Sequence, residues 1–188
     1  MSSANFELRT SRLKLRHWRP DDLPPFAELN ADPKVMEYFP AVLSAEESNA
    51  LAARITQNIE QFGFGLWAVE ENVSGDFIGF VGLQNLNSQL PIAPGVEIGW
   101  RLATQYWGLG YATEAAQTAL EYGFNELQLS EVVATTTLSN QRSQAVMRRL
   151  AMRRDEETFA HPFLAENHPL RQHCVFRIRK SGWQAQIK

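Results

Sequence analysis

The most informative stretch of the sequence is Gln105–Glu114, where two glycines stand directly between a predicted strand and the start of a predicted helix. Without a Cβ at Gly108 and Gly110, consecutive backbone N–H groups can turn toward one centre, and the helix N-terminus adds a favourable dipole. The pattern therefore predicts a cradle for a phosphate or pyrophosphate group. An ordinary glycine-rich turn between a strand and a helix is the alternative interpretation.

Two other phosphate-binding motifs do not fit this stretch. A nucleoside-triphosphate loop ends in Gly-Lys-Ser/Thr, whereas Gly110 is followed by Tyr111 and Ala112. A dinucleotide-binding fingerprint needs a third glycine in the helix, and it is missing here. The phosphate group is therefore expected to belong to a ligand of another class.

The elements around this loop form a strand–helix–strand succession. Residues 95–102 read as a strand, and the helix after the loop carries one small apolar face: Ala112, Ala115, Ala116, Ala119, Leu120 and Phe124. Residues 132–136 are rich in β-branched side chains and are predicted to form the next strand. Because a helix connects them, the two strands are expected to run parallel.

The rest of the chain alternates helices and strands in a mixed α/β pattern. Ser44 and Glu47 form a predicted capping box, after which Leu51, Ile55, Ile59 and Phe62 fall on one helical face. Other expected elements are a strand at 13–16, a helix after 20–22, a short turn at 36–39, a hairpin from 66–69 and 77–83, a helix at 140–150, and strands at 153–159 and 173–178.

Size and charge limit the possible functions. With 188 residues, no internal repeat and no flexible linker, the sequence predicts one domain over 1–188. The formal net charge of -3 provides no basic field for nucleic acid. No stretch reaches the ~18 apolar residues of a membrane span, and the first seven residues lack a secretory signal pattern. We therefore expect neither nucleic acid nor membrane as a partner, and a monomer or homodimer.

The cysteine and histidines give no sign of metal or thiol chemistry. The lone Cys174 excludes an internal disulfide and fits a reducing, cytoplasmic compartment. Because Cys174 lies in a predicted apolar strand, a buried inert thiol is favoured over a nucleophile. His17, His161, His168 and His173 lack metal-ligand spacing, so surface or loop roles are favoured and no metal is expected.

Three features in order resemble the GNAT superfamily of acyl-CoA-dependent N-acyltransferases. The run Gln105-x-x-Gly108-x-Gly110-Tyr111-Ala112 resembles that family's coenzyme A pyrophosphate loop. Val96–Trp100 is similar to its splayed fourth strand, with Gly99 as the expected bulge that frees backbone groups for the pantetheine arm. Asn140 and Ser143 are similar to its Asn-x-x-Ser element beside the thioester, although both residues are equally suited to capping a helix.

The resemblance covers about Leu13 to Ile178 and implies a fold, a co-substrate and a site. Residues 10–16 and 168–177 look like the branch of ribosomal-protein N-terminal acetyltransferases. The implied α+β fold has a mixed, mostly antiparallel sheet of about six to seven strands, one splayed parallel pair and about four helices. The implied acetyl-CoA contacts are Ile98, Gly99, Trp100, Arg101, Leu102, Gln105, Gly108, Leu109, Gly110, Tyr111, Ala112, Thr113, Asn140 and Ser143.

The resemblance also suggests residues for the reaction. Glu97 is the candidate base, provided that partial burial raises its pKa; a structural carboxylate paired with an arginine is the alternative. Ser143 is the candidate donor to the leaving thiolate, because Phe176 stands where relatives often carry a tyrosine. Tyr38 and Phe39, together with the 160–171 loop, are expected to border the acceptor groove. The pair Ala151-Met152 replaces a frequent Gly-aromatic pair, which is expected to affect packing more than chemistry.

The sequence leaves several hypotheses for the acceptor. A peptide α-amine has a pKa of about 7.7–8.0 against about 10.4 for lysine, so losing its proton near pH 7 costs about 1 kcal/mol rather than about 4–5 kcal/mol. The α-amino group of a protein or peptide is therefore the leading prediction. A small amine such as a polyamine, amino acid or aminoglycoside is the alternative within enzymes. A non-catalytic acyl-CoA sensor is the alternative from another class.

Overall fold

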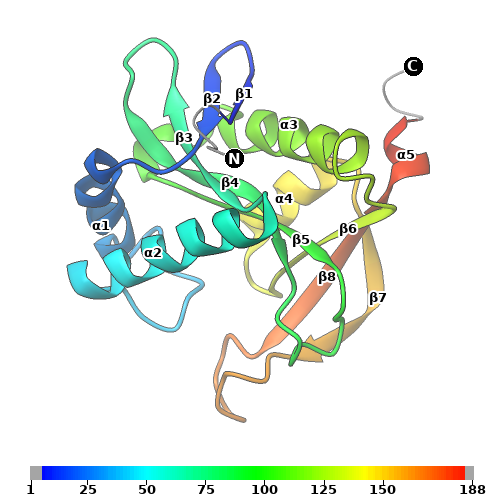
Figure 1. Ribbon diagram of the computed structural model, residues 1–188. Coiled ribbons are helices and arrows are strands. Elements are labelled where there is room, and N and C mark those ends of the chain that lie inside the picture. Colours follow the sequence, from blue (N-terminus) through cyan, green and yellow to red (C-terminus); the bar gives the residue numbers. More distant parts are fainter. Residues whose placement is uncertain (1–5, 185–188) are drawn as a thin grey trace.

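The computed structural model describes residues 6–184 and shows a central sheet with helices on both faces (Figure 1). The expected absence of a signal segment concerns the first residues, of which 1–5 lie outside the described part. The strands are β1 (Glu7–Arg9), β2 (Leu13–Arg16), β3 (Leu66–Glu71), β4 (Phe77–Asn85), β5 (Val96–Leu102), β6 (Glu131–Thr137), β7 (Arg153–Ala160) and β8 (Gln172–Arg179). The helices are η1 (Pro20–Asp22), α1 (Leu23–Ala31), α2 (Ala45–Phe62), η2 (Thr104–Tyr106), α3 (Tyr111–Asn125), α4 (Gln141–Arg149) and α5 (Lys180–Gln184).

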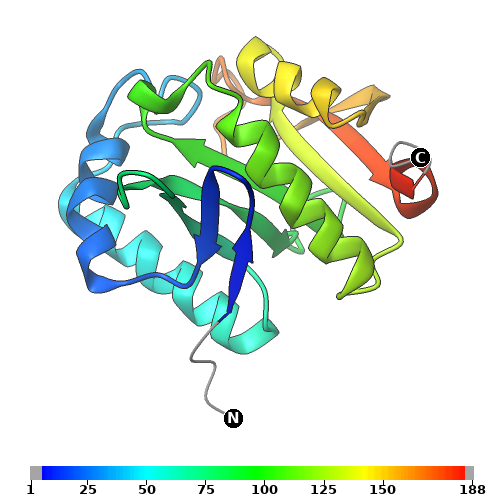
Figure 2. The same ribbon diagram turned by 90° about the horizontal axis from the view of Figure 1, so that it is seen from above.

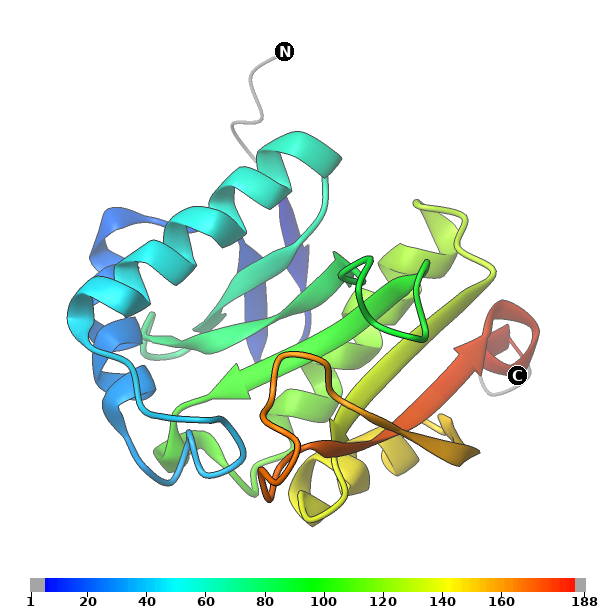
Figure 3. The same cartoon turned by 90° about the horizontal axis from the view of Figure 1, so that it is seen from below.

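The sheet is mixed and mostly antiparallel, as predicted, with the strand order β1-β2-β3-β4-β5-β6-β8-β7. The parallel neighbours β5 and β6 pair at a single position in the described chain, Glu97 opposite Val133. Both strands continue beyond that pair and diverge (Figure 3). The predicted splayed pair is thus present, with its gap open toward the C-terminal ends of β5 and β6.

The bulge expected at Gly99 is absent. β5 pairs with β4 in continuous register from Val96 to Leu102, and Gly99 lies opposite Gly82 without a shift. The register shift lies instead between β3 and β4, next to Gly79, whose φ is 137°. β5 is regular along β4, so a bulge in β5 does not cause the splay. The strands splay because β6 pairs with β5 at one position and then diverges from it.

The helices form two layers. α1 and α2 lie on one face of the sheet, and α3 and α4 on the other (Figure 2). On the α3 side, a Cβ built at Gly123 would come within 2.8 Å of Leu83 on β4, and Leu83 lies opposite Ile98. On the other side, Arg101 donates to Asn30 of α1. Since side chains alternate along a strand, Glu97 and Gly99 share the face of Arg101, under α1 and α2.

The predicted capping box starts α2 as expected. The Ser44 amide donates to the Glu47 carboxylate at 2.8 Å, and the Glu47 amide donates to Ser44 Oγ at 3.2 Å. Ile55 and Ile59 of the predicted stripe are buried, whereas Phe62 is 46% exposed. Phe62 is the last residue of α2, before the left-handed Gly63. No helix within residues 6–184 is long and apolar enough to cross a membrane.

Two short elements were not expected from the sequence, namely β1 and α5, which extend the predicted set to eight strands and five α-helices among residues 6–184. At the end of α4, Ala151 has a φ of 54°. The Met152 amide donates to the Met147 carbonyl at 3.0 Å, as in a Schellman cap. Ala151 therefore occupies a left-handed position that suits glycine, so its replacement of glycine affects the backbone as well as the packing.

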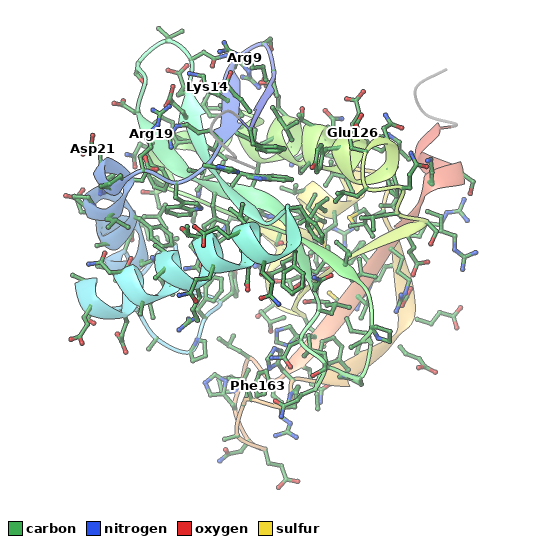
Figure 4. The ribbon with its side chains drawn as sticks, in the orientation of Figure 1. Arg9, Lys14, Arg19, Asp21, Glu126 and Phe163 are labelled. Carbon is green, nitrogen blue, oxygen red and sulfur yellow. The ribbon has the colours of Figure 1, made fainter. Side chains whose placement is uncertain are left out.

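A buried ion cluster ties β2 to β3 and η1. Arg16 is 5% exposed and binds Asp22 through two nitrogens at 2.8 Å each and Glu70 at 2.7 Å. Lys14 of β2 and Arg19, both labelled in Figure 4, also contact Glu70, at 2.7 Å and 3.0 Å. Burial alone raises the pKa of Glu70, but the hydrogen bonds and charges of Lys14 and Arg16 outweigh it and bring that pKa to about 2.

Candidate active site

The glycine loop between β5 and α3 has the backbone that its sequence predicts. Gly108 and Gly110 have φ values of 75° and 82°, and Gly110 is the N-cap of α3. A Cβ at Gly108 would meet nothing within 4 Å, so the left-handed conformation, and not crowding, calls for glycine there. Gly108, Leu109 and Gly110 are exposed. Their amides are available to a phosphate beside the N-terminus of α3.

The other predicted loop contacts lie on either side of these glycines. Gln105 is exposed in η2, and Tyr111, Ala112 and Thr113 are half-buried in the first turn of α3. The Trp107 indole donates to the Leu102 carbonyl at 2.8 Å. This bond fixes the start of the loop against the end of β5.

The first hairpin holds the loop through side-chain hydrogen bonds that the sequence analysis did not predict. Thr10 Oγ1 and the Arg12 amide donate to one oxygen of Glu114 in α3, at 2.5 Å and 3.1 Å. Arg12 Nε donates to the other oxygen at 2.7 Å, and Arg12 Nη1 donates to the Leu109 carbonyl at 2.9 Å. The turn between β1 and β2 is therefore clamped onto the phosphate loop. Only the Thr10-to-Arg16 resemblance hinted that this segment mattered.

The gap between β5 and β6 exposes main chain on the edge of β5. The Ala103 amide bonds the Ile78 carbonyl at 2.9 Å, and the continuous register then makes Arg101, Gly99 and Glu97 the residues whose backbone faces β4. The intervening Trp100 consequently directs its N–H and C=O into the gap. Ile98 and Leu102 are buried residues on the same edge.

Glu97 lies where the gap begins. Thr135 Oγ1 of β6 donates to one carboxylate oxygen at 2.6 Å, and Gln84 Nε2 of β4 donates to the other at 3.3 Å. Within residues 6–184 it forms no ion pair with an arginine or lysine. Burial raises the pKa of Glu97, and the hydrogen bonds from Thr135 and Gln84 counteract this only in part. The arginine-paired alternative is thus not what the structure shows.

A cavity opens beside the Gln84 partner of Glu97. Its volume is about 120 Å³, and it lies between the C-terminal part of α2 and strands β3 and β4. Its lining combines apolar and amide side chains: Ile55, Asn58, Phe62, Phe64, Gly65, Leu66, Gln84 and Asn85. The sequence did not point to this cavity, because its wall joins segments far apart in the chain.

Asn140 and Ser143 stand at the start of α4, on the opposite face of the sheet from Glu97. Asn140 Oδ1 accepts the Ser143 amide at 3.1 Å, so Asn140 is the helix cap that the sequence allowed. Ser143 is half-buried, and its hydroxyl makes no hydrogen bond within residues 6–184. α4 packs against β6 and α3. Glu97 and Ser143 therefore lie on opposite faces of the sheet.

Tyr38 and Phe39 lie in the loop between α1 and α2 and link three parts of the site. The Phe39 ring covers the Arg101 guanidinium, with 4.1 Å from its carbon to the ring centroid. Arg142 of α4 lies 5.4 Å from the Tyr38 ring and 4.7 Å from the Trp107 ring. The loop thus spans from β5 to α4, next to the glycine loop.

The 160–171 loop joins β7 and β8, and its His161 ring lies against the ring of His173 in β8. The rings of His161 and His173 lie 4.8 Å apart, and burial lowers the pKa of both. Phe163 projects at the far end of the loop (Figure 4) and is 55% exposed. Cys174 is fully buried, and burial raises the pKa of its thiol, as expected for an inert side chain. No group of three or more possible metal-ligating side chains forms among the described residues.

Comparison with known proteins identifies the protein family. The acetyltransferase (GNAT) domain family matches residues 12–153. The uncharacterised N-acetyltransferase YnaD of Bacillus subtilis is 33% identical over 152 residues, covering 79% of this chain and 83% of that protein. The uncharacterised protein YkkB of Bacillus subtilis is 32% identical over 151 residues, covering 80% and 87%. A GNAT-family acetyltransferase from Bacillus anthracis superposes with a TM-score of 0.78 at 25% identity, covering 94% of this chain and 99% of that one.

The chain therefore belongs to the GNAT acetyltransferase family and is an acetyl-CoA-dependent N-acetyltransferase. The structure is compatible with that co-substrate. Two exposed left-handed glycines stand at a helix N-terminus, and the Trp100 main chain faces a gap between diverging strands. These are the places where a diphosphate and an amide-containing arm could be bound by backbone groups.

Proposed function

We propose that this enzyme acetylates the α-amino group of a protein or peptide and that Glu97 is its general base. The observation that carries the proposal is the environment of Glu97, whose half-buried carboxylate lies at the start of the strand gap and accepts hydrogen bonds from neutral donors. A base with a raised pKa is suited to taking a proton near neutral pH. The α-amine is the acceptor that such a base deprotonates at least cost.

Acetyl-CoA supplies a thioester whose carbonyl carbon forms the new C–N bond as the C–S bond breaks. We assign the diphosphate to the amides around Gly108–Ala112 and the pantetheine arm to the Trp100 main chain. Glu97 takes the proton of the attacking amine, directly or through one water. The free hydroxyl of Ser143, on the other side of the gap, donates to the leaving thiolate. Within Ile98–Trp100, a main-chain N–H that faces the gap stabilises the developing oxyanion, whereas the Gly99 N–H faces β4.

The acceptor would lie on the α1–α2 side of the sheet. Glu97 faces that side, and the cavity next to Gln84 offers room for the side chain beside the attacking amine. Tyr38 and Phe39 border the other end. A relative named as a putative ribosomal N-acetyltransferase, YdaF of Bacillus subtilis, is 28% identical over 112 residues, covering 60% of this chain and 58% of that protein. That similarity supports a protein N-terminus as the acceptor class.

The test is a panel of peptides with free N-termini, matched N-blocked peptides with an internal lysine, polyamines, amino acids and aminoglycosides, each with acetyl-CoA. Thiol release and product mass are measured. We expect the free-N-terminus peptides to give the highest kcat/KM. A higher value for any small amine overturns the assignment. Heat of binding or thermal stabilisation by acetyl-CoA without thiol release for any amine would instead indicate an acyl-CoA sensor.

A further inference from the structure

Arg101 is a second charged residue on the acceptor face, meaning the α1–α2 side of the sheet, and it lies four residues along β5 from Glu97. Arg101 shares the face of Glu97 and Gly99 because side chains alternate along the strand. The Cα atoms of Glu97 and Arg101 are therefore about 13 Å apart, at about 3.3 Å per residue. Between them lies Gly99, which is partly exposed. A Cβ built at Gly99 would meet only one atom within 4 Å, Cδ2 of Leu66 at 3.6 Å.

Arg101 has no anionic partner in the described chain. Its only side-chain hydrogen bond within residues 6–184 runs from Nη1 to Asn30 Oδ1, at 2.6 Å. Nε is shut off from solvent without a partner. The guanidinium lies 4.1 Å from the Phe39 ring centroid and 5.3 Å from that of Phe80. These neighbours hold the group in place, but they leave its charge uncompensated.

The cost of this arrangement points to a ligand. Burial lowers the pKa of Arg101 to about 10, although the group is still charged at neutral pH. A partly desolvated charge without a counter-ion is unfavourable, and a guanidinium has five donors, which suit a carboxylate in a bidentate geometry. Arg16, the one arginine among the buried residues of the described chain, differs because it contacts two carboxylates, Asp22 and Glu70.

We propose that Arg101 binds a carboxylate of the acceptor, so that the preferred substrate is a peptide with an acidic residue at its second or third position. An extended chain advances about 3.3–3.6 Å per residue, so an amine at Glu97 places that side chain over Gly99 toward Arg101. The same charge disfavours a polyamine, whose cations would meet an unpaired guanidinium. This inference rests on the proposed peptide N-terminal activity and names its substrate class.

The experiment compares kcat/KM for three peptides that differ only at the second or third residue: glutamate, glutamine or lysine. We expect wild-type enzyme to prefer glutamate over glutamine by about tenfold or more, and to use lysine least. Arg101→Gln is expected to reduce the glutamate-to-glutamine ratio to about twofold or less, while Arg101→Lys retains part of it. The KM for acetyl-CoA should stay within about twofold in both variants.

Arg179→Gln is the control, because Arg179 at the end of β8 is an exposed arginine outside the site and already pairs with Glu131. Its peptide ratio should equal that of wild type. If wild type acetylates the peptides without an acidic preference, or if Arg101→Gln keeps that preference, this inference is wrong while the proposed activity stands. If no peptide is acetylated, the proposed activity itself fails. If Arg101→Gln does not fold, the three-peptide comparison on the wild-type enzyme decides the question. It is repeated at high salt, where the preference for glutamate must become smaller.

Discussion

Glu70 and Glu97 lie on strands β3 and β5 of the same sheet, and hydrogen bonds from neighbouring side chains hold both carboxylates. Lys14, Arg16 and Arg19 surround Glu70, and its pKa is about 2 despite burial. A hydroxyl and an amide hold Glu97, and burial raises its pKa. Cationic donors stabilise the ionised form far more than neutral donors do. The two groups therefore suit different tasks, one in stability and the other in proton transfer.

The arginines show the same contrast. Burial opposes ionisation of Arg16, but its bonds to Asp22 and Glu70 prevail and raise its pKa. Arg101 has only Asn30 and two aromatic rings around it, and its pKa falls to about 10. Near β2 and η1, each buried charge has an opposite charge in contact. On the acceptor face, Glu97 and Arg101 are half-buried, and neither has an oppositely charged partner in the described chain. Uncompensated buried charge is a cost to folding that binding or catalysis can explain.

Removing the carboxylate of Glu97, which has no cationic partner in the described chain, should have the largest effect on activity. We expect Glu97→Gln to lower kcat/KM by about 10²–10⁴-fold, because the base is lost while size and hydrogen bonding are preserved. The pKa of Glu97 is raised, so wild-type activity should increase as pH rises through that pKa, and this limb should vanish in the variant. The measurement is kcat/KM against pH with a peptide acceptor.

The stability of Glu97→Gln should equal or exceed that of wild type, because the buried ionised form is disfavoured. Glu126→Gln, at an exposed position just after α3 (Figure 4), is the matched control and should behave as wild type. Equal pH profiles for Glu97→Gln and wild type would remove Glu97 from the reaction and leave the contrast with Glu70 purely electrostatic.

Removing the carboxylate of Glu70, which is paired with cations, should instead lower stability and leave activity nearly unchanged. With a pKa of about 2 against 4.5, Glu70 contributes about 3 kcal/mol at neutral pH. Because the folded pKa is depressed, this contribution is present above about pH 4.5 and is lost as pH falls toward about 2. We expect Glu70→Gln to lower the free energy of unfolding in urea by about 3 kcal/mol at pH 7, with a smaller difference at pH 3.

Per folded molecule, Glu70→Gln should retain kcat/KM within about twofold, since Glu70 is in the ion cluster and not in the strand gap. A stability difference that does not change between pH 7 and pH 3 would contradict the assigned role of the ion cluster.

A substitution that changes no charge should have the smallest effect, and it gives a reference for the stability changes at Glu97 and Glu70. Ala151→Gly removes a Cβ from a residue with a φ of 54°, where a left-handed alanine costs about 1–2 kcal/mol. Glycine also gains entropy in the unfolded chain, so the expected net stabilisation is about 1 kcal/mol or less. Urea unfolding measures it. An unchanged or lower stability would show that the cap tolerates alanine without strain, and kcat/KM should not move.

Local chemistry made much of this molecule predictable. The Ser44–Glu47 box, the glycines of the phosphate loop and the β-branched run of β6 each act within a few residues, so the sequence alone indicates them. The same holds for Asn140, whose bond to the Ser143 amide spans three residues. Glu97 was predicted with a condition on its burial, and the structure supplies that burial.

Long-range pairing was not predictable in the same way. The sequence suggested a bulge at Gly99, but the splay comes from the single β5–β6 pair, which depends on how β6 packs against β8. The missing partner of Arg101 is equally non-local, because it depends on residues from α1, β4 and the loop before α2. Three residues of β1 carry too weak a pattern to be recognised without their partner strand.

The clamp of Thr10 and Arg12 on Glu114 means that the first hairpin and the glycine loop do not open independently. Detaching the hairpin would strip Glu114 of its donors and free the Leu109 carbonyl. A ligand that holds the loop must then also protect the hairpin against local unfolding, by the same free energy with which an attached hairpin favours that ligand. The β1–β2 hairpin is thereby energetically linked to co-substrate affinity, although it lies outside the groove where the amine reacts.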